Sequence, residues 1–135
     1  MSNSMQQIII TEPGGVEKLA YQSVAIPTPE ANEVLVKVHA FGLNRPDILQ
    51  RQGLYPMPKG VTPVPGLEVA GVIDAVGSDV TEFKVGDKVC GLTNGGGYAE
   101  YCVVPETQIL AIPAGVSFVQ AAAIPETFYT VWANV

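Results

Sequence analysis

The sequence predicts a mainly β domain, folded as a β-barrel or a twisted sheet system. Roughly six to eight short β-prone stretches follow one another closely, and little helical pattern is present until the end of the chain. The 14 glycines and 11 prolines supply many turns and are unsuited to a helical bundle. With 135 residues, 47% of them hydrophobic, the chain can bury a core without disulfides or metal ions.

The first strands are delimited by turn residues. Residues 6–11 are rich in isoleucine and are followed by a Pro-Gly-Gly turn. Residues 19–26 form a second β-prone stretch, which two prolines stop. Valines at alternate positions of residues 34–38 indicate a half-buried third strand.

A short helix is expected after the third strand. Asn44 or Arg45 can cap it, a proline suits its first turn, and Gly53 lies just past its end. Ile48 and Leu49 are expected to face the core.

The middle of the chain alternates loops and strands. Residues 54–65 form a proline-rich loop that carries an exposed Tyr55. Residues 65–77 return to strand chemistry, and Gly71 within them suggests a bulge or a close backbone approach. Residues 83–91 contain a turn that leads into another strand.

The last strands precede two helical runs. The glycines of residues 94–97 signal a hairpin turn before a strand at 98–104, and residues 109–112 form a last short strand. A helical run with Ser117 as N-cap extends to residue 124, where Pro125 interrupts it. A second run over residues 126–135 reaches the last residue without a C-cap signal, so we expect the chain to be part of a longer protein. Its apolar residues are spaced like one helix face: Phe128, Val131, Trp132 and Val135.

Charge and composition exclude several classes of function. A formal net charge of −6 disfavours nucleic-acid binding. Cys90 and Cys102 are too few for a disulfide framework and lack metal-site spacing, so two reduced thiols are expected, although one pair could bridge. No stretch approaches the length of a membrane span, and the polar first residues show no secretory signal. We expect a cytoplasmic protein.

Five segments, in this order, carry a family resemblance: GLNRPD at 42–47, PGLEVAG at 65–71, VGDKV at 85–89, GGYAEY at 96–101 and AAAIP at 121–125. Together they resemble the catalytic domain of medium-chain dehydrogenases/reductases, a GroES-like β-barrel. The resemblance covers nearly the whole chain.

Two substitutions within these segments are informative. Zinc members of the resembling family carry a ligating cysteine at the position of Asn44 and a ligating histidine at that of Leu67, and catalytic zinc needs about three protein ligands. His39, the one histidine, sits on a strand away from both positions, and residues 92–97 form only a short turn where the structural-zinc lobe would be. The sequence is therefore similar to the zinc-free quinone oxidoreductases, especially the p53-inducible subgroup.

The resemblance implies a domain organisation, a cofactor and an oligomeric state. Residues 1–124 would form the acceptor-side catalytic domain, and residues 125–135 would begin a bridging helix into a Rossmann nucleotide-binding domain absent from this chain. The cofactor would be NADPH, with NADH possible, and no zinc would be bound. The full-length protein would be a homodimer, and these 135 residues alone would be inactive.

Four candidate site residues follow. An amide at Asn44 can bind a nicotinamide carboxamide or ribose, although a plain helix N-cap is the alternative. Tyr55 can donate to a quinone oxygen and stack on its ring, or it can simply pack its own loop. Thr127 and Thr130 match positions beside the nicotinamide in similar enzymes, with Thr130 the better match, or they are ordinary helix threonines.

Several polar residues flank this presumed cleft. Glu68 matches an acidic position near the metal of zinc members, and we expect it to be a structural hydrogen-bond acceptor here. Arg45 is expected to pair with Asp47 on the surface, with the acceptor pocket as its alternative. Tyr98 and Tyr101 are expected to pack the barrel.

The function expected from the resemblance is reduction of a quinone by hydride transfer from NAD(P)H. Without a metal to polarise a carbonyl, an electrophilic acceptor is favoured, either a quinone or an α,β-unsaturated carbonyl. One alternative is therefore a zinc-free enal, enone or enoyl-thioester reductase. A second, of another class, is a non-catalytic binding module on the same barrel.

Overall fold

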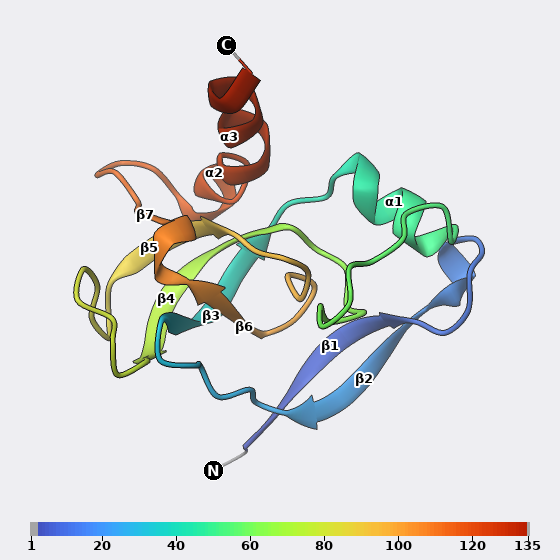
Figure 1. Cartoon of the computed structure of the whole chain (residues 1–135), viewed down its shortest axis with the longest axis horizontal. Helices are drawn as coiled ribbons and strands as arrows, with labels where there is room; N and C mark the ends of the chain where they lie inside the picture. Colours follow the sequence, from blue (N-terminus) through green and yellow to red (C-terminus); the bar gives the residue numbers. More distant parts are fainter. Residues whose placement is uncertain (1–2, 135) are drawn as a thin grey trace.

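The computed structural model describes residues 3–134 and confirms a mainly β domain. A five-stranded antiparallel sheet has the order β6-β3-β4-β5-β7, and β1 and β2 form a separate antiparallel hairpin (Figure 1). The strands are β1 (Ser4–Ile10), β2 (Leu19–Ala25), β3 (Glu33–Phe41), β4 (Glu68–Val76), β5 (Lys88–Leu92), β6 (Tyr101–Pro105) and β7 (Ile109–Ala111). The helices are η1 (Val16–Lys18), α1 (Arg45–Arg51), η2 (Glu106–Gln108), α2 (Phe118–Ala121) and α3 (Pro125–Asn134).

The hairpin is tied to the larger sheet through the segment that precedes β6. Gln7 forms an isolated antiparallel bridge with Ala99, and the N–H of Ile8 donates to the carbonyl of Tyr98 at 2.8 Å. The carboxylate of Glu100 accepts the N–H of Gln6 at 2.7 Å. These contacts place the segment around Tyr98 between the two sheets.

The main core fills one side of the five-stranded sheet with β-branched residues from its central strands. Its largest fully buried members include Val34, Val36, Val69 and Ile73. Gly71 lies where β3 and β4 approach closely, since a Cβ there would collide with the carbonyl oxygen of Lys37. The close approach predicted at Gly71 is therefore confirmed.

Local signals set the helix boundaries well. Asn44 is the N-cap of α1, a proline occupies its first turn, and Gly53 follows the helix with a φ of 78°. Ser117 caps α2: its hydroxyl accepts the N–H of Gln120 at 3.1 Å, and the side chain of Gln120 accepts the N–H of Ser117 at 3.0 Å. Both caps were predicted.

Three local expectations are wrong. Pro125 begins α3 instead of interrupting a helix, because the first helical position needs no N–H partner. The turn at 94–97 does not close a hairpin, because β5 pairs with β4 and β7 while β6 pairs with β3, and regular strand begins only at Tyr101. Ile48, which was expected to face the core, is 39% exposed.

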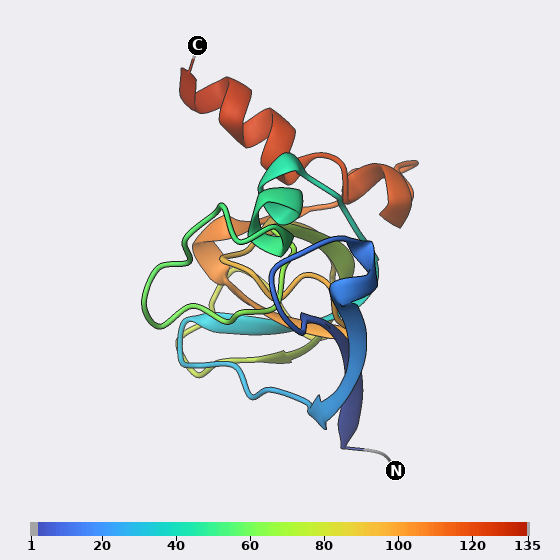
Figure 2. The ribbon, with the colours of Figure 1, turned by 90° about the vertical axis from the view of Figure 1, so that its right-hand side faces the viewer.

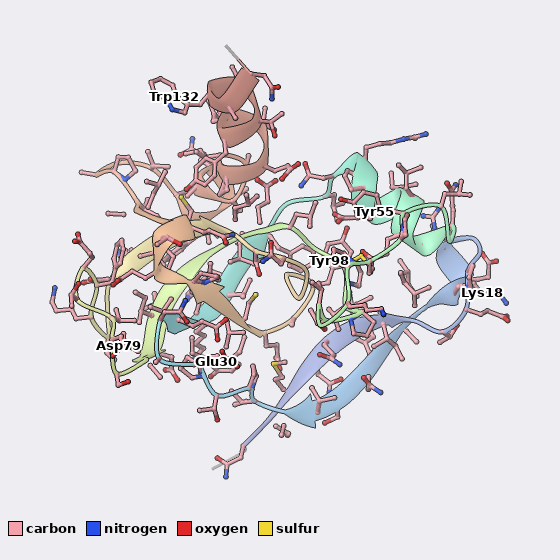
Figure 3. The ribbon with its side chains drawn as sticks, viewed as in Figure 1. Lys18, Glu30, Tyr55, Asp79, Tyr98 and Trp132 are labelled. Carbon is pink, nitrogen blue, oxygen red and sulfur yellow. The ribbon has the colours of Figure 1, made fainter. Side chains whose placement is uncertain are left out.

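The last helix projects away from the strands (Figure 2). Phe128, Val131 and Trp132, which were expected to share one helix face, are all exposed, and Trp132 is 87% exposed and points away from the sheet (Figure 3). Val135 lies outside the described residues. No helix within residues 3–134 is both long and apolar enough to cross a membrane.

Candidate active site

A buried carboxylate at the start of β4 organises the candidate site. Glu68 is 3% exposed. One of its oxygens, Oε1, accepts a hydrogen bond from Nδ2 of Asn44 at 3.0 Å, and Oε2 accepts the backbone N–H of Glu126 at 2.8 Å. Glu68 therefore joins the N-cap of α1 to the first turn of α3, and the structural-acceptor role expected for it is found.

The backbone around Glu68 leaves space for this carboxylate only because residue 42 is a glycine. The N–H of Gly42 donates to the carbonyl of Glu68 at 3.3 Å. A Cβ on Gly42 would overlap Oε1 of Glu68, the atom that holds Asn44. Gly42 therefore leaves room for the side chain of Glu68, and Asn44, two residues later, donates a hydrogen bond to that side chain.

A second buried carboxylate holds the backbone of the same asparagine. Oδ2 of Asp47 accepts the N–H of Asn44 at 3.0 Å, as in a capping box, and also the hydroxyl of Tyr98 at 2.8 Å. The other oxygen of Asp47 is buried and accepts no hydrogen bond from the described residues. The pairing of Arg45 with Asp47 that was expected is not found within residues 3–134, because Asp47 turns inward while Arg45 is exposed.

Tyr98 packs as predicted, but its hydroxyl has a partner that the sequence did not reveal. Its ring stacks on Phe41 with centroids 4.6 Å apart. Burial raises the pKa of Tyr98, and its hydrogen bond to Asp47 raises that pKa further. The one available signal was general: a buried tyrosine hydroxyl needs a partner, and a carboxylate at a helix N-terminus can be one.

Tyr55 lies in a separate small pocket beside α1 (Figure 3). The tyrosine is 40% exposed. The pocket has a volume of about 290 Å³ and is lined by Tyr55, Met57, Pro58, Val61, Leu67 and Asn94. Leu67 is the chain neighbour of Glu68, so this mostly apolar pocket adjoins the Asn44–Glu68 pair along the backbone.

Thr127 and Thr130 are exposed on α3. Glu68 places the start of α3 beside Asn44, and Thr127 follows directly after Glu126, whose N–H makes that bond. Burial, and then the nearby charges of Glu68 and Asp47, raise the pKa of the Glu126 carboxyl. The structure thus brings Asn44 and the first turn of α3 together, whereas Tyr55 is connected to them only through the loop before β4.

The cysteines are free and buried. Burial raises the pKa of Cys90, and it raises that of Cys102 to about 11. Both thiols therefore stay protonated near neutral pH, and the two cysteines are free, as expected.

A larger cavity than the one beside Tyr55 lies away from this site. It has a volume of about 580 Å³ and lies between β1, β3 and α2, where His39 stacks on Phe118 with ring centroids 4.3 Å apart. None of the four candidate residues lines it. Residues 3–134 hold no cluster of three or more histidine, cysteine, aspartate or glutamate side chains suited to a metal ion.

The topology and the site together define a class of protein, a GroES-like domain of the kind found in alcohol dehydrogenases. The family model described as "Alcohol dehydrogenase GroES-like domain" matches residues 30–114. The chain belongs to this family.

Named relatives narrow the comparison. Over 128 residues the chain is 42% identical to a quinone oxidoreductase from Sus scrofa, a match that covers 93% of this chain and 39% of that protein. It superposes on the crystal structure of the CurK enoyl reductase with a TM-score of 0.88 at 34% identity, covering 99% of this chain and 42% of the other. It also superposes on a mycobacterial protein solved in complex with NADPH, with a TM-score of 0.78 at 35% identity, covering 88% and 36% of the two chains. The chain therefore spans about two fifths of the length of such relatives.

Proposed function

We propose that the full-length protein containing this chain reduces quinones with NADPH, by hydride transfer and without zinc. The observation that carries the proposal is the identity and setting of two residues. At the positions where zinc members of the resembling family have ligands, this chain has Asn44, whose amide is bound by a carboxylate, and Leu67, which lines an apolar pocket. Neither side chain supplies a thiolate or an imidazole.

The residues around Asn44 suit a nicotinamide in their chemistry. A side-chain amide has four hydrogen-bonding sites, and Glu68 uses only one of them. The amide can therefore still bind the carboxamide of a nicotinamide ring. We assign Thr127, in the first turn of α3, and Thr130, in the middle of that helix, to the same cofactor, and both are exposed. The similarity to a structure that holds NADPH supports this choice of cofactor.

The acceptor is assigned to the pocket beside Tyr55. The pocket is mostly apolar and has about the volume of a small ring compound. The Tyr55 hydroxyl can donate a hydrogen bond to a carbonyl oxygen of the acceptor, and its ring can stack on a planar substrate. The bound cofactor supplies the hydride, and the residues of this chain orient the two partners and exclude water.

One alternative has specific support. The similarity to an enoyl reductase favours reduction of an α,β-unsaturated carbonyl or enoyl thioester on the same scaffold. Both acceptor classes are electrophilic enough to accept hydride without a Lewis acid. They differ in shape, because an enoyl thioester is extended whereas a quinone is a compact ring.

The test is an acceptor screen of the full-length protein. NADPH oxidation would be measured with ortho-quinones, para-quinones, 2-alkenals and enoyl thioesters, with the metal content of the same sample determined in parallel. We expect the highest kcat/KM with a quinone and less than stoichiometric zinc. Turnover of alkenals or thioesters alone would select the alternative, and no turnover of any acceptor, with no NADPH binding, would indicate a non-catalytic module. Stoichiometric zinc would overturn the zinc-free mechanism.

A further inference from the structure

Glu68 faces two hydrogen-bond donors in a buried position. A carboxylate can only accept, so the nitrogen of the Asn44 amide must face Glu68 and its oxygen must face away. The second donor, the backbone N–H of Glu126, bonds to the other carboxylate oxygen. A glutamate satisfies both donors at once, whereas a neutral glutamine offers one acceptor and one donor.

We propose that Glu68 is a positioning residue that fixes which way the Asn44 amide is turned and holds α3 in register with it. The inference rests on the proposed function in one respect: the ligand that forms hydrogen bonds with the Asn44 amide is the nicotinamide carboxamide of NADPH. A carboxamide has its own donor and acceptor sides, so it distinguishes the two orientations of the asparagine amide. Glu68 itself does not touch the reacting atoms.

Asn44 is held by separate hydrogen bonds at its backbone N–H and at its side-chain amide. Asp47 holds the backbone N–H of Asn44 and is itself held by Tyr98, while Glu68 holds the side chain. The backbone position and the amide orientation of one residue are thus set by two different buried carboxylates. The Asp47 bond is that of a capping box and is expected of a helix N-cap, whereas the bond from the Asn44 side chain to Glu68 is not part of a cap.

The bond to Glu126 extends the same control to the second cofactor-binding element. Glu126 is the second residue of α3 and precedes Thr127, which we assign to the cofactor. One carboxylate therefore sets the spacing between the two elements. Moving it would disturb the cofactor contacts from both sides, while the acceptor pocket at Tyr55, which Glu68 does not line, would be left unchanged.

The test exchanges the amide and the carboxylate in the full-length protein. In Glu68→Gln, the new amide NH2 must face either the Asn44 amide or the Glu126 N–H, and both of these are donors. In Asn44→Asp, two carboxylates face each other. Each single change should therefore lower the urea midpoint of unfolding. In the double variant E68Q/N44D, the new amide at position 68 can donate to the new carboxylate at position 44 and still accept from Glu126. We expect its urea midpoint to return close to that of the unaltered protein.

Cofactor binding gives the second readout. By fluorescence titration, without turnover, Glu68→Gln should raise the Kd for NADPH about tenfold, the scale of one misplaced buried hydrogen bond, and leave the KM of the acceptor within about twofold. The double variant should not recover full NADPH affinity, because the new carboxylate still offers an outward oxygen but lacks the one N–H of the Asn44 amide that Glu68 does not use. Glu106→Gln is a matched control, since Glu106 also accepts two backbone N–H groups, from Thr81 and Glu82, but through a single oxygen and far from Asn44. It should change neither NADPH affinity nor the KM of the acceptor.

The outcomes separate the inference from the proposed function. A double variant no more stable than the weaker single variant would overturn the pairing, and unchanged NADPH affinity in Glu68→Gln would overturn the positioning role. If Glu68→Gln does not fold, the double variant must still fold, and Gly42→Ala, which displaces the carboxylate without changing its charge, must weaken NADPH binding instead. If the unaltered protein binds no NADPH, the proposed function and the positioning of a cofactor both fail, while the urea midpoints still decide whether Asn44 and Glu68 are paired.

Discussion

Tyr98 donates its hydroxyl proton to Asp47 at 2.8 Å, across 51 positions of the sequence. The bond joins the segment before β6 to the first turn of α1. The same oxygen of Asp47 also accepts the backbone N–H of Asn44. Asp47 therefore links the segment before β6 to the backbone of Asn44.

We expect Tyr98→Phe to lower the free energy of unfolding by about 1–2 kcal/mol, because it leaves a buried Asp47 oxygen with one donor fewer. Urea denaturation of the full-length protein measures the effect. Tyr21→Phe is the control, since Tyr21 is 79% exposed and its hydroxyl is free to bind water. Equal midpoints for Tyr98→Phe and the unaltered protein would show that the bond contributes nothing to stability.

A pH dependence follows from the buried thiol of Cys102. Its pKa is raised from 9.0 to about 11 by burial, so the folded protein keeps a proton that the unfolded chain releases from about pH 9 upward. The unfolded state binds fewer protons in this range, and stability therefore falls as the pH rises, by at most about 1.4 kcal/mol per pH unit and by about 2 kcal/mol in all by pH 11.

Cys102→Ala removes this one titration. We expect its free energy of unfolding, measured between pH 8 and pH 11, to fall less steeply than that of the unaltered protein, whatever the offset caused by the smaller side chain. Parallel curves for the two proteins would refute the assignment. Below about pH 9 their slopes should coincide, because the thiol is protonated in both the folded and the unfolded state.

Structural features that depend on residues close together in the sequence, such as helix caps, were predictable from the sequence. The boundaries of α1 follow from an asparagine, a proline and a glycine at fixed offsets, and the close approach at Gly71 follows from a glycine within a strand. Asn44 was predictable as a helix N-cap, whereas its site role and that of Tyr55 were expected from the family resemblance and remain predictions. The family comparison confirms the fold that the five ordered segments implied.

Features that depend on distant partners were not predictable. The glycines at 95–97 indicate a turn but do not say which strands it connects, and here those strands pair with different neighbours. The inward turn of Asp47 depends on Tyr98, and the role of Glu68 depends on Glu126, 58 residues later. Nothing local to either carboxylate identifies its donor.

The 135-residue chain by itself should not turn over NADPH. It spans 39% of the length of the Sus scrofa quinone oxidoreductase, and the residues assigned here to the cofactor lie on an exposed helix and one loop end. We expect neither saturable NADPH binding nor quinone-dependent NADPH oxidation by the purified chain, under conditions in which the full-length protein shows both. Steady turnover by the short chain would mean that the cofactor site is complete within it.

Tyr55→Phe tests the acceptor pocket separately from the cofactor site. Removing one hydroxyl that donates to a carbonyl oxygen should lower kcat/KM for the quinone about 5- to 50-fold, the range expected for one hydrogen bond at a reacting group. The Kd for NADPH should not change, because Tyr55 lies in the pocket with Leu67 and makes no hydrogen bond to Asn44 or Glu68 within the described residues. Tyr101→Phe, on β6 and outside this pocket, is the matched control. A loss of NADPH affinity in Tyr55→Phe would place this tyrosine on the cofactor, and unchanged kinetics with every acceptor would leave it as a packing residue of its loop.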